Sequence, residues 1–292
     1  MPSESAGPPV RTRPERGRLS PEALAAARGG AQEGLTWLGR SPESRADWLV
    51  RAVNVVARLI LFRIFGFKVK APGRELLPEA GGYLVVAAIH RGWMDPFLIL
   101  NALPLEPRAW FLGSGPSAFS ARWRELLLHR LGGMLPVWRG GLGVDQHVAS
   151  ARAVLANGGV FVLVPEGGVA GPPDRLATFR HGAALIALRT GAPIVPIALA
   201  GAGELYLGKR LASRILAPTS ALALLADEWD GTPPEVGSRS ELTLARALTR
   251  RFEEVLGPAV MAIYQGTVDP PTHRRRLRGL TWLLLARPRS RG

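Results

Sequence analysis

The chain has 292 residues, of which 47% are hydrophobic and none is cysteine. This length suffices for one large domain with a full core, and the lack of cysteine excludes disulfides, thiolate metal sites and cysteine nucleophiles. The formal net charge is +14, and only three of the 37 basic residues are lysines. We therefore expect an anionic partner: nucleic acid, an anionic membrane surface or a phosphorylated substrate.

Residues 1–19 contain arginines and prolines but no apolar core of the length that a secretory signal needs. We expect a disordered tail there. Two helix starts follow, Ser20-Pro21-Glu22 and Ser41-Pro42-Glu43. Each has a hydroxyl cap, a proline at the first helical position and an acid in the first turn. Residues 20–67 are therefore predicted to form N-terminal helices.

The second of these helices continues through residues 48–67, the most hydrophobic stretch of the chain. Three arginines offset its apolar residues, so that spanning a bilayer is not clearly favoured. Four polar residues form one stripe at helical spacing, Asp47, Arg51, Asn54 and Arg58, whereas Arg63 falls off it. Two interpretations stay open: an amphipathic membrane-docking helix in the membrane interface, which we favour, and a helix of the protein core with its stripe at the surface.

From residue 68 to about 270 the pattern is that of an α/β domain. Apolar runs predict strands at 83–89, 108–112, 135–138, 160–164 and 194–200. Helical stretches between them, near 95–103, 116–131, 144–157 and 177–190, imply parallel pairing. The predicted fold class is α/β, with a mixed, mostly parallel sheet flanked by helices.

The last third of the chain is less regular. Residues 201–237 have no clear pattern, and Ser238 with Glu241 forms a capping box that opens a helix to about residue 265. The basic C-terminal tail, residues 271–292, contains an apolar run far too short to span a bilayer. This tail is either a second interfacial contact or a disordered end.

A histidine and an aspartate follow the first predicted strand in the sequence HRGWMDPF, which begins at His90. Five positions apart, they cannot meet on one helix, so a turn at Gly92 is expected to bring Asp95 back towards the imidazole. Asp95 then caps a helix with Pro96 at its first position. An ionised carboxylate beside a histidine fixes its tautomer and stabilises the imidazolium, as a general base requires. The alternative is a histidine at the edge of the core beside an ordinary helix cap.

Three further stretches end predicted strands at the same edge of the sheet, where ligands bind in open α/β folds. They are GMLPVWRG with Arg139, VPEGG with Glu166, Gly167 and Gly168, and APIVPIA, whose prolines suit an edge strand or the entry of a strand better than a sheet centre. No cluster of histidines and acids has metal-ligand spacing, so no metal site is expected. The other histidines, at 129, 147, 181 and 273, are isolated.

In this order, the four blocks resemble those of the PlsC-like glycerolipid acyltransferases, which acylate glycerol phosphate and lysophospholipids. Family members typically contain NHxSxxD, GxxPVxR or GxxFIxR, FPEGTRS and a VPI-type block, and the resemblance covers residues 68 to about 200. It implies that His90 and Asp95 are the catalytic pair of an HX4D motif. It also implies that the acceptor is bound by Arg139, Glu166, Gly167 and Gly168. The acyl donor would be acyl-CoA or acyl carrier protein, a substrate, with no cofactor.

The chain departs from the family pattern in two blocks. Ile89 replaces the asparagine of the first block, and Gly92 its serine. In the third block, Val169 and Ala170 replace Arg-Ser, which removes a phosphate-binding arginine. The arginines nearest in sequence to the lost position are at 175 and 180.

Three functions compete. We favour an acyltransferase that moves a fatty acyl group from acyl-CoA or acyl carrier protein to the hydroxyl of a lysophospholipid, of the lysophosphatidic acid type, at the cytoplasmic face of a membrane. Because the chain has no cysteine and no GxSxG motif, direct attack by the acceptor hydroxyl is expected. The second is a catalytically weak relative that binds lipids at an anionic membrane surface. The third, a nucleic-acid binder, rests on charge alone and lacks a reader motif, so no nucleic-acid partner is expected.

Overall fold

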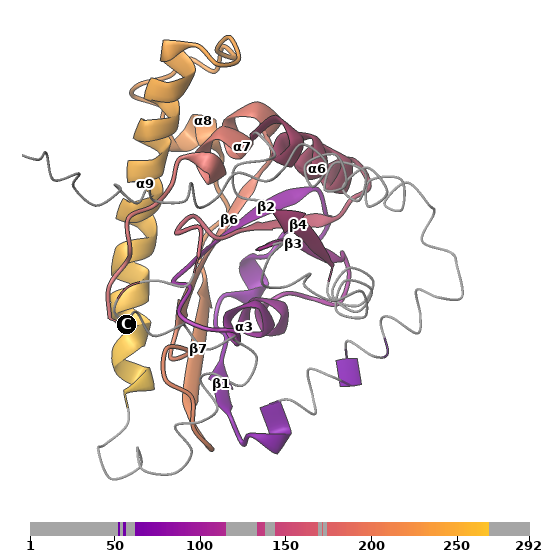
Figure 1. Ribbon diagram of the computed structural model, residues 1–292, viewed down its shortest axis with the longest axis vertical. Coiled ribbons are helices and arrows are strands. Elements are labelled where there is room, and N and C mark those ends of the chain that lie inside the picture. Colours follow the sequence, from indigo (N-terminus) through magenta and orange to yellow (C-terminus); the bar gives the residue numbers. More distant parts are fainter. Residues whose placement is uncertain are drawn as a thin grey trace, which may run out of the picture.

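The computed structural model describes residues 52, 55–56, 62–114, 133–137, 144–168, 171 and 174–268. These residues form three layers, in which a seven-stranded sheet lies between α3 on one face and α6, α7 and α9 on the other (Figure 1). The strands are β1 (Lys68–Lys70), β2 (Tyr83–Ala88), β3 (Ala109–Ser114), β4 (Met134–Val137), β5 (Val160–Leu163), β6 (Ile194–Ala200) and β7 (Arg210–Ile215). The helices are α3 (Asp95–Ala102), α6 (Val144–Ala156), α7 (Gly182–Thr190), α8 (Ala221–Leu224) and α9 (Arg239–Tyr264), with 3-10 turns η1 (Arg74–Leu76) and η2 (Gln265–Thr267).

The strand order across the sheet is β1-β7-β6-β2-β5-β3-β4. Five strands, β2 to β6, run parallel to one another, whereas β7 runs antiparallel to β6 and β1 runs parallel to β7. The sheet is therefore mixed and mostly parallel, and the predicted fold class is confirmed. All five predicted strands are present, with ends within two residues of the prediction.

Strand β2 lies inside the sheet between β6 and β5, and all six of its residues are buried. Its alternate side chains enter two different clusters. Leu84 and Val86 pack with α6, α7 and α9, whereas Val85 and Ala87 pack on the side of α3. Burial on both faces explains why this strand is a continuous apolar run instead of an alternating one.

Helix α7 begins at Gly182, five residues after the start predicted from the sequence. The residues before it donate their main-chain N–H groups to tertiary partners: Ala177 to the Glu166 carboxylate, Phe179 to the Glu253 carboxylate and Arg180 to the carbonyl of Pro165. These long-range hydrogen bonds hold the segment outside the helix. Local periodicity could not reveal them.

Two strands were not predicted. β1 has only three residues, two of them lysines, and β7 falls within the region that the sequence left unassigned. Each is stabilised by pairing, since β7 bonds to both β1 and β6. Ser238 is the N-cap of α9 as predicted, because its side chain accepts the N–H of Glu241. The return contact of the capping box differs, since the Glu241 side chain accepts the N–H of Gly237 and not that of Ser238.

Pro193 and Pro196 suggested an edge strand or the entry of a strand. Pro193 directly precedes β6, as expected for a strand entry, but Pro196 lies within β6, which is an inner strand between β2 and β7. The N–H of Ile194 donates to Thr219 on the β7 side, so the nitrogen of Pro196, two residues on, faces the same side. There Pro196 stands opposite Leu216, the residue after the end of β7, and its carbonyl accepts the N–H of Leu216 at 3.0 Å. The missing proline donor therefore falls just beyond the end of β7, where the pair keeps one of its two hydrogen bonds.

Several predicted segments lie outside the described residues: the tail of residues 1–19, almost all of the N-terminal helices of residues 20–67, the helix near 116–131 and the basic tail of residues 271–292. The described end of the N-terminal region packs on the α3 side of the core through Phe62, Phe65 and Phe67. None of the helices in the described ranges is both long enough and apolar enough to cross a membrane.

Arg189 on α7 joins α7 to α6 and α9. Its Nε and Nη2 donate to the two carboxylate oxygens of Glu241 at 2.6 and 2.8 Å, and its Nη1 pairs with Asp145. Glu241 is 1% exposed at its side chain and also accepts the N–H of Gly237 at 2.7 Å. The hydrogen bond from Arg189 is the main cause that lowers the pKa of Glu241 from its usual value of 4.5.

We predict that Arg189→Met lowers the free energy of unfolding by about 3 kcal/mol, because it leaves a buried carboxylate without its counter-charge. The matched control is Asp145→Asn, since the Asp145 carboxylate is 82% exposed and the loss of such a pair costs about 1 kcal/mol or less. Urea denaturation of both variants measures the difference.

The same pair predicts a dependence on pH. Because the pKa of Glu241 is lower in the folded than in the unfolded chain, its contribution to stability is complete above pH 4.5 and is lost as the pH falls through the folded pKa. The stability difference between the wild type and Arg189→Met should therefore shrink below that pH. A difference that stays constant down to about pH 3 would contradict the assignment.

Candidate active site

His90 and Asp95 meet just beyond the carboxyl end of β2. The strand ends at Ala88, and Asp95 is the first residue of α3. The Nδ1 atom of His90 lies 2.9 Å from Oδ2 of Asp95. The imidazole is 19% exposed, whereas the carboxylate is 3% exposed. The structure thus brings together the two residues that the sequence singled out, in the order strand, histidine, turn, aspartate, helix.

Asp95 does not cap α3 as predicted, because Met94 occupies the N-cap position and no side chain caps the helix. Its Oδ2 instead accepts the N–H groups of Arg91 at 2.6 Å and Gly92 at 2.8 Å. Because this oxygen already accepts two main-chain N–H groups, it also acts as an acceptor towards His90. Nδ1 of His90 therefore carries the hydrogen and donates it to Asp95, and Nε2 keeps its lone pair. The nitrogen that can take a proton from a substrate is therefore Nε2.

Gly92 serves the turn through its small size. Its φ is not in the positive range that glycine alone favours, so the predicted conformational role is wrong. A Cβ built on Gly92 would lie 2.7 Å from the carbonyl oxygen of Ala202. The connection between β6 and β7 therefore packs directly on the turn, and this close approach accounts for glycine at the position where the resembling family has serine.

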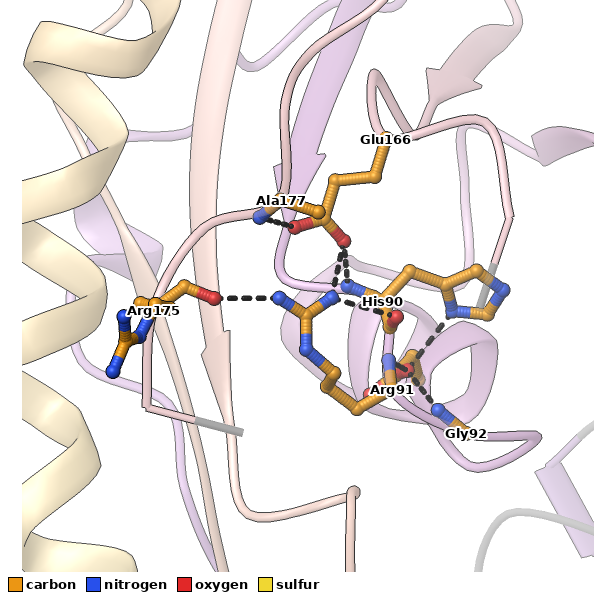
Figure 2. A network of polar contacts seen from close by, with 7 residues as sticks. His90, Arg91, Gly92, Glu166, Arg175 and Ala177 are labelled. Carbon is orange, nitrogen blue, oxygen red and sulfur yellow. Dashed lines mark hydrogen bonds and ion pairs between the residues drawn. The ribbon is translucent and has the colours of Figure 1, made fainter. Parts of the chain in front are cut away.

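Glu166 lies behind the dyad with its side chain fully buried. Its Oε2 accepts the N–H of His90 at 2.7 Å and Nη1 of Arg91 at 2.7 Å, and its Oε1 accepts the N–H of Ala177 at 2.9 Å. Figure 2 shows this carboxylate beside the main chain of His90, while the imidazole points away from the guanidinium of Arg91. Glu166 is thus satisfied by protein donors, and its geometry suits the support of the turn.

Gly167 and Gly168 follow Glu166, the first exposed and the second half-buried. Gly167 has a φ of 67°, and a Cβ built on it would lie 2.7 Å from Cδ of Arg180. The aliphatic part of the Arg180 side chain therefore lies across Gly167, and Arg180 is exposed to solvent. In the described part of the chain no carboxylate pairs with the Arg180 guanidinium. This guanidinium can therefore bind an anionic ligand beside the third block.

The site occupies the switch point of the sheet. β2 and β5 are parallel neighbours, but the helix after β2 packs on one face and the helix after β5 on the other. In open α/β sheets ligands bind at the carboxyl ends of two strands related in this way. His90 follows β2 and Glu166 follows β5, so both lie at this point.

Arg139, Val169 and Ala170 lie outside the described residues. The structure adds one residue that the sequence did not indicate, Arg91, whose side chain is 4% exposed and pairs with Glu166. Only its position next to His90 could have drawn attention to it, since the chain has many arginines. Within the described ranges, no group of three or more histidines and acids is arranged to hold a metal ion.

These features define an α/β protein in which a histidine is hydrogen-bonded to a buried carboxylate at the carboxyl edge of a mostly parallel sheet. Residues 68–200 match the sequence profile of the family described as Acyltransferase. Residues 68–200 therefore form an acyltransferase domain of that family. The predicted family and the predicted enzyme class, an O-acyltransferase, are both confirmed by this match.

Among solved structures, the chain is similar to the 1-acyl-sn-glycerophosphate (LPA) acyltransferase PlsC from Thermotoga maritima. The TM-score is 0.50 with 18% sequence identity, over 80% of this chain and 89% of that chain. At this identity the similarity shows the shared fold. A comparison with curated protein sequences finds no significant match.

Proposed function

We propose that the protein transfers a fatty acyl group from acyl-CoA or acyl carrier protein to the free hydroxyl of a lysophospholipid of the lysophosphatidic acid type. The observation that carries this proposal is the His90–Asp95 pair, with the Nδ1 atom 2.9 Å from the carboxylate, within an acyltransferase domain. The donor enters as a substrate, and no cofactor is required for the chemistry.

In the proposed reaction, Nε2 of His90 takes the proton of the acceptor hydroxyl as its oxygen attacks the thioester carbonyl carbon. The carbon–sulfur bond of the tetrahedral intermediate then breaks, and the imidazolium returns the proton to the departing thiolate. Asp95 stabilises the imidazolium through Nδ1. The products are the diacylated lipid and the free thiol, and no acyl-enzyme is formed.

A catalytically weak lipid-binding relative is the alternative, since Gly92 and Val169-Ala170 depart from the family pattern. The close approach of Ala202 to Gly92 favours the enzyme, because the lost serine is accommodated by packing while the dyad remains intact. Turnover of purified protein with an acyl-CoA and a lysophospholipid, compared with His90→Ala, separates the two functions.

The acceptor's phosphate is proposed to be bound by arginines, which match phosphate oxygens in a planar fork. Arg139 is the candidate from the family pattern. Arg180 is the candidate from the geometry, since its exposed side chain crosses Gly167 immediately after the buried Glu166. Arg180 would then replace the arginine that the third block lacks.

We further propose that the protein works at the cytoplasmic face of an anionic membrane. Ile64 and Leu207 are 65% and 50% exposed, and their segments are joined by the hydrogen bond from Gly208 N–H to the carbonyl of Phe65. The two strands that follow, β1 and β7, begin at the carboxyl edge of β6, because Ala200 pairs with Ala212. This apolar pair therefore lies at the edge of the sheet that contains His90, with Lys68 exposed beside it.

For the dyad, we predict that His90→Ala lowers kcat by about a hundred- to ten-thousand-fold, the usual contribution of a positioned general base. Asp95→Asn should lower kcat strongly while the protein stays folded, because an amide oxygen can still accept the N–H groups of Arg91 and Gly92. Steady-state kinetics with matched circular dichroism spectra tests both variants. Near wild-type turnover of His90→Ala would contradict the assignment of the base.

For the headgroup, we predict that Arg180→Ala raises the KM for lysophosphatidic acid about tenfold or more and leaves the donor KM unchanged, since a charge-assisted hydrogen bond contributes about 1.5 to 3 kcal/mol. Arg139→Ala should likewise raise the acceptor KM more than the donor KM. Arg246→Ala on α9 is the control, because Arg246 is also exposed and the change of charge is the same. An unchanged acceptor KM in Arg180→Ala would place the phosphate elsewhere.

For the membrane, we predict that Ile64→Ser with Leu207→Ser lowers binding to anionic vesicles about tenfold, because each side chain then contributes less apolar area to the interface. Leu222→Ser with Val236→Ser is the control. Those residues are 48% and 65% exposed but follow β7, at the opposite edge of the sheet (Figure 1). Equal cosedimentation of both double variants with the vesicles would contradict the proposed face.

A further inference from the structure

The side chain of Arg91 turns back from the HX4D turn into the protein and donates hydrogen bonds there. Its Nη1 donates to Glu166 Oε2 at 2.7 Å and to the carbonyl of His90 at 3.0 Å. Its Nη2 donates to the carbonyl of Arg175 at 2.6 Å. A guanidinium that is 4% exposed is tolerated only when its charge and its donors are matched, so these partners are a requirement of the fold.

The ion pair holds the main chain of His90 from both sides. Glu166 accepts the N–H of His90 at 2.7 Å, and Arg91 donates to the carbonyl of the same residue at 3.0 Å. Asp95 orients the imidazole, but the position of the peptide unit that carries it depends on the Arg91–Glu166 pair. A misplacement of about 1 Å can lower a rate about a hundredfold.

The other end of the network holds Arg175 and Ala177, which follow the third block. Arg91 binds the carbonyl of Arg175, and Glu166 binds the N–H of Ala177, as Figure 2 shows. Gly171 also lies close, since a Cβ built on it would be 3.4 Å from Nη2 of Arg91. The loop that follows the third block and the main chain of the base are therefore bound to the same buried pair.

We propose that Arg91 is a positioning residue that couples the segment of residues 174–177, which follows the third block where the acceptor is expected, to the general base His90. This inference rests on the proposed acyl transfer. The two terminal nitrogens of the guanidinium bind different groups: Nη1 donates to Glu166 and to the carbonyl of His90, and Nη2 donates to the carbonyl of Arg175. A lysine has one nitrogen, so it can keep the contacts of Nη1 but not that of Nη2.

The test compares Arg91→Lys with the wild type and with Arg152→Lys. Arg152 is a matched control, because it also donates to a main-chain carbonyl, that of Arg189 at 2.8 Å, away from the site. We expect Arg91→Lys to lower kcat about tenfold or more with an unchanged donor KM, and Arg152→Lys to behave as the wild type. Retention of wild-type kcat by Arg91→Lys would overturn the proposal.

Trypsin supplies a readout that does not depend on activity, because it cleaves after Arg175, whose carbonyl Arg91 holds. Arg91→Lys should speed cleavage of the Arg175–Leu176 bond, whereas the control should not.

If the wild type transfers no acyl group to any lysophospholipid, the proposed function fails. The coupling is then tested by this cleavage rate and by the Nδ1–H resonance of His90 in ¹⁵N-labelled protein. The cleavage rate and the resonance are both expected to change in Arg91→Lys. If either stays as in the wild type, the proposed coupling is overturned.

The double variant Arg91→Met with Glu166→Gln separates positioning from stability, because it removes both buried charges together. We expect its thermal midpoint to exceed that of Arg91→Met alone, while kcat stays low. Recovery of kcat together with the midpoint would show that Arg91 only stabilises the fold, and would overturn the positioning role.

Discussion

The site depends on two buried carboxylates that hold one turn of the chain. Asp95 accepts hydrogen bonds from the imidazole of His90 and from two main-chain N–H groups. Glu166 accepts the main-chain N–H of His90, although it lies 76 residues away in the sequence. Charged acceptors form stronger hydrogen bonds than neutral ones, above all where water is excluded. The histidine is thereby fixed at its side chain and at its main chain before any substrate binds.

Buried ion pairs recur as connections between distant segments of this protein. Arg91 and Glu166 join the first and third blocks, and Arg189 with Glu241 joins α7 to α9. In both pairs the carboxylate also accepts main-chain N–H groups, which offsets the cost of removing the charges from water. The exposed pair of Arg251 with Glu254 makes a much smaller contribution, because water already solvates both groups.

The connection between β6 and β7 links the site to the proposed membrane face. Ala202 packs on Gly92 at one end of it, and Leu207 is exposed at the other, beside the segment that ends with Phe67. A serine in place of Gly92 would require this connection to move. Glycine in place of the family's serine is thus explained by the packing of Ala202, which lies 110 residues away in the sequence.

The sequence by itself determined the elements whose signal is local. β2 and β6 are continuous apolar runs, the Ser238 cap is a short-range motif, and the five-residue spacing of His90 and Asp95 required a turn that brings them together. Only the tertiary structure decided the strand order, the strands β1 and β7, the place of Pro196 inside the sheet and the role of Arg91. Each of these depends on partners that are remote in the chain, and the pattern of neighbouring residues contains no information about which remote group will satisfy a given donor or acceptor.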